Sequence, residues 1–321
     1  MKFKRIEICY LLLILLIFLI ITGYKKVPNW EASLYTPTMI QKIDDTYFIV
    51  DCHHHRIIYN DNLTDEISKW NTLTKDIKGG HSIASDGELY IIDDTDNAML
   101  KIFIKYKNKF QQKQIIENIT GRPHYVAYDD DTKCFYVIAS LEQKIYTIGN
   151  MSGKAIITDV KTIPELGSYV RSFNLIDGYM YTVSGSSILK IDYKNGFSIL
   201  KSYSVPDELI GMNHIAKIGQ YFYISSYTNA SGEKKPDFVR IKDLTNLVDG
   251  EYETLYNTFG FEGTPYYISY FDNKYFITEI DASSGVKSFN VKNDKISNIK
   301  TYYYFKGHSQ ASQERRDSKI Q

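Results

Sequence analysis

A short segment rich in aromatic and β-branched residues occurs six times along this chain of 321 residues. Each copy follows a turn that contains Asp, Asn or Gly, and this combination favours a β-strand over a helix. A recurrence of about 40–50 residues is typical of architectures in which each repeat is one small sheet. The copies begin at Tyr47, Leu89, Phe135, Met180, Phe222 and Tyr275, so consecutive copies start 42, 46, 45, 42 and 53 residues apart.

The stretch around each copy has room for three further strands, which divides residues 37–305 into six repeats separated by turns such as Lys194-Asn195-Gly196. One four-stranded sheet cannot bury both of its faces, so the repeats must stack around a common axis. The sequence therefore predicts an all-β protein, a six-bladed β-propeller with four-stranded antiparallel blades. It leaves open whether a strand from residues 29–36 completes the last blade. Leu63–Trp70 is interpreted as a helical segment that covers a blade edge.

The N-terminus has the pattern of an export signal or a membrane anchor. Three basic residues precede Ile8–Gly23, a segment without any charged residue, and no cleavage site or lipid-modified cysteine is evident after it. We expect residues 1–26 to form an uncleaved signal anchor, a transmembrane helix whose N-terminus stays in the cytoplasm; a cleaved, secreted form is the alternative. A linker at 27–36, an extracytoplasmic propeller and a polar flexible tail at 306–321 would follow.

Charge and cysteine content narrow the class of protein. The 38 Lys and Arg residues balance 38 Asp and Glu residues, so no basic field is available to hold nucleic acid. Three cysteines do not make a disulfide framework. Cys52 and Cys134 fall at opposite ends of second strands in different repeats, so we expect both to be unpaired. A composition rich in Lys, Ile, Asn and Tyr, together with an export signal, favours a bacterial cell-surface protein.

Two loops, with the strands beside them, resemble a known repeat family. Ile49–Tyr59 and Ile91–Phe103 are similar to the NHL-repeat consensus, in which an Asp closes the second strand, a polar turn follows, and the third strand carries an Arg and an aromatic residue. Arg56 matches the consensus Arg, whereas the second repeat has Ala98 and Met99 there and the other repeats keep only the spacing. The resemblance implies an NHL-like six-bladed propeller, a family that contains both binding platforms and enzymes.

One polar residue per repeat falls where the innermost strand of each blade should begin. These residues precede the next recurrent segment by eight to eleven positions, and inner strands of a propeller begin beside the central channel. We therefore expect a ring of side chains at one level of the channel. Its members are Thr38, His81, His124, Arg171, His214 and Tyr266. Three of the seven histidines of the chain are among them. The alternative interpretation is that these polar side chains only hold water in the channel and bind no ligand.

Further polar residues should reach the same face, where they would complete a binding site. Second strands end in carboxylates, including Asp94 and Glu279, and the loop His53–His55 follows one of them. Arginines there would hold an anionic group through paired hydrogen bonds, and Tyr125 would stack on a sugar. The expected ligand is a small polar or anionic molecule, a glycan or a partner protein. The predicted ligand-binding residues are His81, Arg122, His124, Arg171, His214, Tyr266, Asp51 and Asp93.

The histidines also allow an enzymatic interpretation. Three neutral histidines and a water molecule form a catalytic zinc site, in which the metal lowers the pKa of the water. The amidating-lyase branch of NHL-like propellers holds zinc in this way, with Arg and Tyr close by. This resemblance implies that His81, His124 and His214 would bind zinc in a metal-dependent lyase or hydrolase. In the binding-module interpretation no cofactor is expected, and the sequence leaves open whether the protein is an enzyme.

Overall fold

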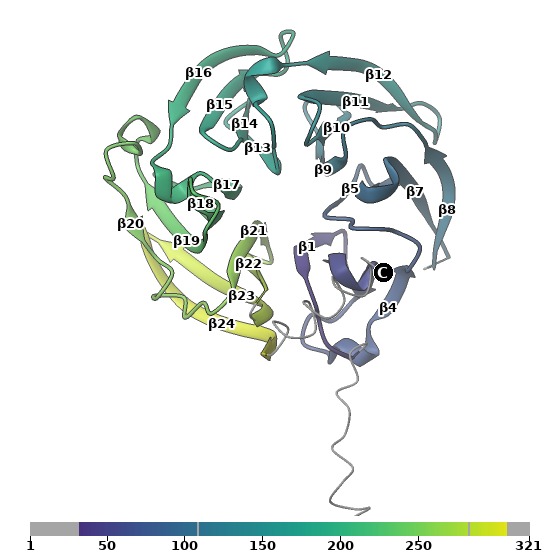
Figure 1. Cartoon of the computed structure of the whole chain (residues 1–321). Coiled ribbons are helices and arrows are strands. Elements are labelled where there is room, and N and C mark those ends of the chain that lie inside the picture. Colours follow the sequence, from purple (N-terminus) through teal and green to yellow (C-terminus); the bar gives the residue numbers. More distant parts are fainter. Residues whose placement is uncertain (1–31, 108, 282, 307–321) are drawn as a thin grey trace, which may run out of the picture.

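Six four-stranded antiparallel sheets form a ring in the computed structural model, which describes residues 32–107, 109–281 and 283–306 (Figure 1). Each sheet consists of four consecutive strands hydrogen-bonded in sequence order. The six-bladed propeller with four antiparallel strands per blade is therefore confirmed. The predicted signal anchor and polar tail lie outside the described residues, except for the first residue of the tail. Within the described part of the chain, no helix is long and apolar enough to cross a membrane.

The predicted strands are present in all six blades. Blade one contains β1 (Pro37–Ile43), β2 (Thr46–Asp51), β3 (Arg56–Asn60) and β4 (Asn71–Thr74); blade two contains β5 (Ile83–Ser85), β6 (Leu89–Asp94), β7 (Met99–Tyr106) and β8 (Lys109–Ile116); blade three contains β9 (Pro123–Asp129), β10 (Cys134–Ala139), β11 (Lys144–Asn150) and β12 (Ala155–Thr162). Blade four contains β13 (Ser172–Ile176), β14 (Tyr179–Val183), β15 (Ser187–Asp192) and β16 (Ser198–Ser204); blade five contains β17 (Met212–Ile218), β18 (Tyr221–Thr228), β19 (Lys234–Ile241) and β20 (Glu253–Thr254); blade six contains β21 (Thr264–Phe271), β22 (Lys274–Ile280), β23 (Ser283–Lys292) and β24 (Lys295–Lys306).

Helical structure is confined to single 3-10 turns in the described residues. The helix expected over residues 63–70 is wrong in extent, because only the 3-10 turn η3 (Ile67–Lys69) is helical there. Its apolar residues nevertheless have the predicted covering role, since Leu63, Ile67 and Trp70 are buried. The turns are η2 (Cys52–His54), η3 (Ile67–Lys69), η4 (Thr95–Asn97), η5 (Pro164–Leu166), η6 (Asp207–Leu209) and η7 (Leu244–Asn246).

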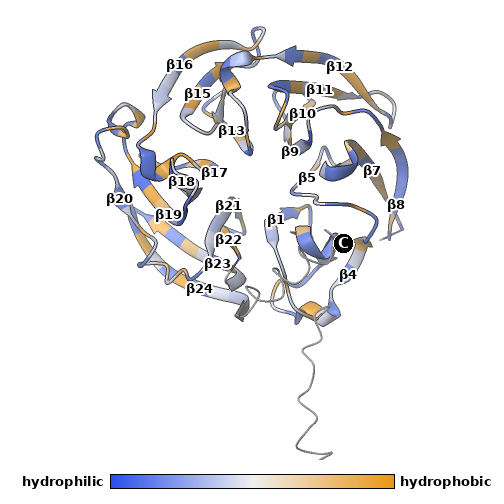
Figure 2. Ribbon diagram, in the orientation of Figure 1, coloured by the Kyte–Doolittle hydropathy of each residue, from blue (hydrophilic) through white to orange (hydrophobic). Residues whose placement is uncertain are grey.

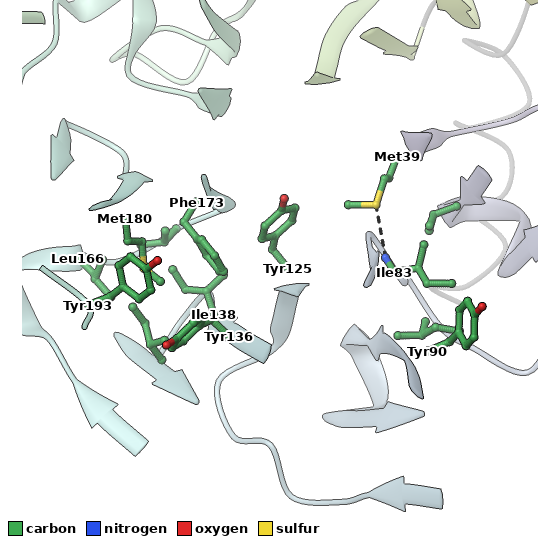
Figure 3. Close-up of a cluster of buried hydrophobic side chains, with 14 of the residues drawn as sticks. Met39, Ile83, Tyr90, Tyr125, Tyr136, Ile138, Leu166, Phe173, Met180 and Tyr193 are labelled. Atoms are coloured by element: carbon green, nitrogen blue, oxygen red, sulfur yellow. Dashed lines mark hydrogen bonds between the residues drawn. The ribbon is translucent and has the colours of Figure 1, made fainter. Parts of the chain in front are cut away.

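Burial explains the composition of the strands. The second strands lie between neighbours inside the blades, and every residue of β6 is buried, so the recurrent segments are apolar on both faces. Outermost strands such as β8 and β12 have a solvent-facing side and mix apolar with polar residues (Figure 2). Adjacent blades share continuous apolar clusters. The cluster in Figure 3 joins blades one to four, from Met39 through Tyr90 and Tyr125 to Phe173.

Among the described residues, the ring closes through side-chain contacts and no exchanged strand is present. Residues 32–36 form no strand, and the sheet of blade six contains only β21–β24. An apolar cluster joins the two ends instead, with Trp70 on one side and Phe276 on the other. Asp272 of blade six accepts hydrogen bonds from Lys42 Nζ at 2.7 Å and from Tyr47 Oη at 2.6 Å.

Candidate binding site at the mouth of the channel

The first strands position the predicted ring residues at one end of the channel, which we call the mouth. Tyr266 lies near the start of β21, and His81 and Arg171 stand just ahead of β5 and β13. The imidazoles of His81 and His124 stack with their centroids 3.8 Å apart and their planes at 25°. The ring of Tyr266, from the far side of the channel, lies 6.5 Å from His81. Side chains of blades two, three and six therefore meet across the axis.

His214 does not lie at this level, so the expectation of a ring with all six members at one height is wrong. Its imidazole packs on the ring of Tyr267, with the ring centroids 4.4 Å apart. The hydroxyl groups of Tyr267 and Tyr125 are hydrogen-bonded to each other at 3.0 Å. This group forms a second layer below the mouth. The strand register shows this: the β-bulge at the start of β17 lies at Asn213, the position equivalent to His124, and His214 is the next residue.

The pairing of the first and second strands shows why the sequence analysis misplaced His214. In blade three the bulged residue is His124, and Tyr125 pairs with Ile138. In blade five the bulge leaves His214 opposite Ser225, the position that corresponds to Ile138. His214 is therefore equivalent to Tyr125 and not to His124. Counting back over turns of unequal length misplaced it by one residue, which in a strand changes the direction of the side chain.

Arg171 is the half-buried cation of the mouth. The carbon at the centre of its guanidinium lies 5.1 Å from the ring centroid of Tyr169 and 5.5 Å from that of Tyr227. Within the described residues no carboxylate lies within 4.0 Å of it, whereas Arg122, at the rim, pairs with Asp96 at 3.1 Å. The mouth thus contains a positive charge without a counter-charge. The two flanking tyrosines were missed in the sequence analysis because they lie outside the repeated positions.

Asp51 and Asp93 lie beside the mouth but have structural partners. Both are fully buried. One oxygen of Asp51 accepts from two backbone N–H groups, and the other accepts from the side chains of His54 and Arg56. Asp93 accepts from the backbone of His81 and Ser82. These hydrogen bonds fix the loops that enter the first strands, so we leave both carboxylates out of the proposed site.

The stacked imidazoles differ in their electrostatics. Burial, together with the nearby charges of His81 and Arg171, holds the pKa of His124 well below its usual range. Burial also opposes protonation of His81, but Cys52, Tyr266 and Asp93 outweigh it and raise the pKa of His81 well above its usual range. Two imidazoles in face-to-face contact cannot easily both carry a charge. The shifts therefore favour the charged form at His81 and the neutral form at His124.

The arrangement does not fit the three-histidine zinc site. His124 uses Nδ1 to donate to the backbone oxygen of Arg171 at 2.8 Å, and His214 lies in the layer below, with its Nδ1 3.1 Å from Ser172 Oγ. Across the parts of the chain that the structure describes, no three His, Cys, Asp or Glu side chains are grouped so that they could hold a metal ion. Cys52 and Cys134 are both unpaired, as predicted.

A cavity of about 550 Å³ lies at the other end of the channel, which the sequence analysis did not consider. It is lined by the far ends of first strands, including Asn174, Lys217 and Ser269. Tyr267 also lines it, so the tyrosine layer separates this cavity from the mouth. Its lysines have partners: Lys217 pairs with Asp177, and Lys42 pairs with Asp272. The mouth, with its unpaired guanidinium, is therefore the better candidate for ligand recognition.

No protein-family model matches the chain, and no curated protein matches it either. Solved structures do. A putative 6-phosphogluconolactonase from Bacteroides uniformis is similar with a TM-score of 0.58 and 10% identity over 84% of this chain and 85% of that chain. Streptogramin B lyase is similar with a TM-score of 0.55 and 14% identity over 88% of this chain and 86% of that chain. Hydrazine synthase of Kuenenia stuttgartiensis is similar with a TM-score of 0.57 and 13% identity over 83% of this chain and 80% of that chain. At such identities the likeness concerns the fold alone.

Proposed function

We propose that the protein is a binding module that captures a small anionic ligand at the mouth of its channel, with Arg171 as the residue that recognises the charge. The observation that carries this proposal is the half-buried guanidinium without a carboxylate partner in the described structure. Partial burial of a charge is costly unless an opposite charge or hydrogen bonds compensate for it. A carboxylate or phosphate of a ligand would supply that partner through two parallel hydrogen bonds.

The surroundings of Arg171 support a ligand with a planar or sugar-like body. Tyr169 and Tyr227 flank the guanidinium and limit the directions from which a ligand can approach it. The carbonyl of Arg171 can only accept, so the hydrogen bond from His124 fixes the proton of this neutral imidazole on Nδ1. Nε2 of His124 then carries a lone pair, which suits a hydroxyl group of the ligand. A glycan with an acidic group would satisfy both requirements.

The test compares an arginine that has no carboxylate partner in the described structure with one that has such a partner. Arg171→Met removes the charge at the mouth, and Arg240→Met is the control. Arg240 also packs on a tyrosine, Tyr221 at 4.6 Å, but it pairs with Glu253 near the opposite end of blade five. Calorimetric titration with inorganic phosphate and with glucuronate should show binding to the wild type and to Arg240→Met, and a loss of about tenfold or more in affinity for Arg171→Met. Equal affinity in all three, or binding of neither anion, contradicts the proposal.

We also propose that residues 1–26 anchor this module in a membrane with the propeller outside the cytoplasm. The support is the uncharged Ile8–Gly23 segment behind three basic residues. Membranes from cells that express the full chain should retain it after alkaline carbonate extraction, and external protease should digest the propeller of intact spheroplasts. Release by carbonate would favour the cleaved, secreted form instead.

A further inference from the structure

Cys52 is placed against a histidine of the neighbouring blade. It follows the last residue of β2, and its Sγ lies 3.8 Å from Nε2 of His81. Only 1% of the residue surface is exposed, but the His81 side chain beside it is 14% exposed, so solvent reaches the pair at the mouth. The sequence analysis considered Cys52 only as half of a disulfide and gave it no chemical role.

A chain of hydrogen bonds fixes the tautomer of His81. Asp93 is a carboxylate and can only accept, so the Thr95 hydroxyl donates to it at 2.7 Å. The Thr95 oxygen must then accept from Nδ1–H of His81, which lies 3.2 Å away. This leaves Nε2 of His81 as the nitrogen that faces the thiol and can take its proton. The order thiol, imidazole, hydroxyl, carboxylate is that of a nucleophile, its base and the groups that orient the base.

The groups around His81 favour its charged form. Asp93 lies 3.7 Å from Nδ1 and supplies a negative charge. The stacked His124 is kept neutral by its burial and adds no positive charge to oppose protonation. The ring of Tyr266 also faces His81, and burial raises its pKa. A proton that leaves Cys52 can therefore remain on His81, and a thiolate next to an imidazolium is the reactive form of a cysteine.

We propose that Cys52 is a nucleophile and His81 its base, with Thr95 and Asp93 as positioning residues, and that the site reacts with small ligands that carry an electrophilic carbon. This goes beyond the proposed ligand capture and does not depend on it. When iodoacetamide serves as the electrophile, the thiolate sulfur forms a bond to the methylene carbon. The carbon–iodine bond breaks, iodide leaves with the bonding electrons, and the thiol proton stays on His81.

The protein contains a matched internal control. Cys134 is more exposed than Cys52, yet its thiol donates to the backbone oxygen of Thr132 at 3.3 Å, and burial raises its pKa. Exposure alone predicts faster reaction at Cys134, whereas the proposed site predicts faster reaction at Cys52. The full chain is treated with iodoacetamide across about pH 5–9, and alkylation of each cysteine peptide is followed by mass spectrometry.

At about pH 6.5 we expect Cys52 to react at least about tenfold faster than Cys134, and His81→Gln should remove this advantage. Thr95→Val keeps the shape of the side chain and should move the pH profile of Cys52 to higher pH, a change that a purely structural role would not produce. The rate comparison needs no variant, so it holds even if a substituted protein does not fold. If Cys52 reacts no faster than Cys134 at this pH, or if its pH profile is the same without His81, the proposal is overturned.

Discussion

Three buried carboxylates have the same structural role at the ends of second strands. Each carboxylate accepts hydrogen bonds from two backbone N–H groups of the loop that leads into the first strand of its own blade. These groups would otherwise be buried without a partner, which costs about 1–3 kcal/mol each. The pairs are Tyr35 and Thr36 on Asp51, His81 and Ser82 on Asp93, and Glu262 and Gly263 on Glu279.

Replacing Asp51 by Asn should lower the free energy of unfolding by about 3–5 kcal/mol at neutral pH, because it removes the negative charge that faces the buried Arg56. Burial acts to raise the pKa of Asp51, but His54 and Arg56 outweigh it and hold the pKa below its usual value. The stabilisation is therefore complete above about pH 4 and is lost as the pH falls further. Urea denaturation at several pH values measures both effects. Asp130→Asn, an exposed carboxylate, is the control and should change stability by less than about 0.5 kcal/mol; an equal loss in both variants would contradict this role of Asp51.

His214 should make the protein sensitive to mild acid. Burial lowers its pKa to about 3, which a backbone interaction with Ile268 opposes only in part. The unfolded chain binds the proton near pH 6.5, so stability from this residue is present above that pH and is lost between about pH 6.5 and 3. The slope is about 1.4 kcal/mol per pH unit for each such histidine. His214→Gln should reduce the slope measured by urea denaturation, whereas an unchanged slope would show that the imidazole is protonated in the folded state.

At the scale of the strand, the sequence predicts what depends on local composition and fails where register decides. The length of the repeat, the composition of the strands and the residues of the turns predicted nearly every strand. Each of these features reflects burial or turn chemistry within one blade. The register that makes His214 equivalent to Tyr125 and not to His124 has no local signal: it follows from how the first strand pairs with the second. The contact between Cys52 and His81 joins two blades and was not predictable from either repeat.

Glycine before a first strand is required by the close approach of two backbones. A Cβ at Gly263 would lie against the backbone oxygen of Ile280 and 2.8 Å from that of Ser283. Gly263→Ala must therefore shift the end of β22 and should cost about 2–4 kcal/mol. At Gly185 no atom lies within 4 Å of the corresponding position, so Gly185→Ala should change stability by less than about 0.5 kcal/mol. Denaturation of both variants under one condition measures the difference, and equal effects would contradict the steric argument.

At the scale of the whole ring, one junction differs from the other five. Consecutive blades are joined by a peptide segment as well as by side chains, whereas the described residues of blades one and six meet through side-chain contacts alone. The linked junctions cannot separate far while both of their blades stay folded. The junction between blades six and one has no such restraint, so the ring should open there first. Its stability depends on the apolar cluster around Trp70 and on the Asp272 hydrogen bonds.

Trp70 can report this opening directly. Its indole packs edge-to-face on Tyr303 of blade six, with centroids 5.8 Å apart, and 7% of the residue is exposed. The other tryptophan, Trp30, lies outside the described residues and can be replaced by Phe, which leaves Trp70 as the single indole of the chain. If the junction opens before the blades unfold, indole fluorescence should change at a lower urea concentration than the far-ultraviolet circular dichroism of the strands. Asp272→Asn weakens the contacts with Lys42 and Tyr47 and should widen the gap between the two transitions. Coincident transitions in both proteins would mean that the six junctions yield together and that the missing peptide link has no effect on cooperativity.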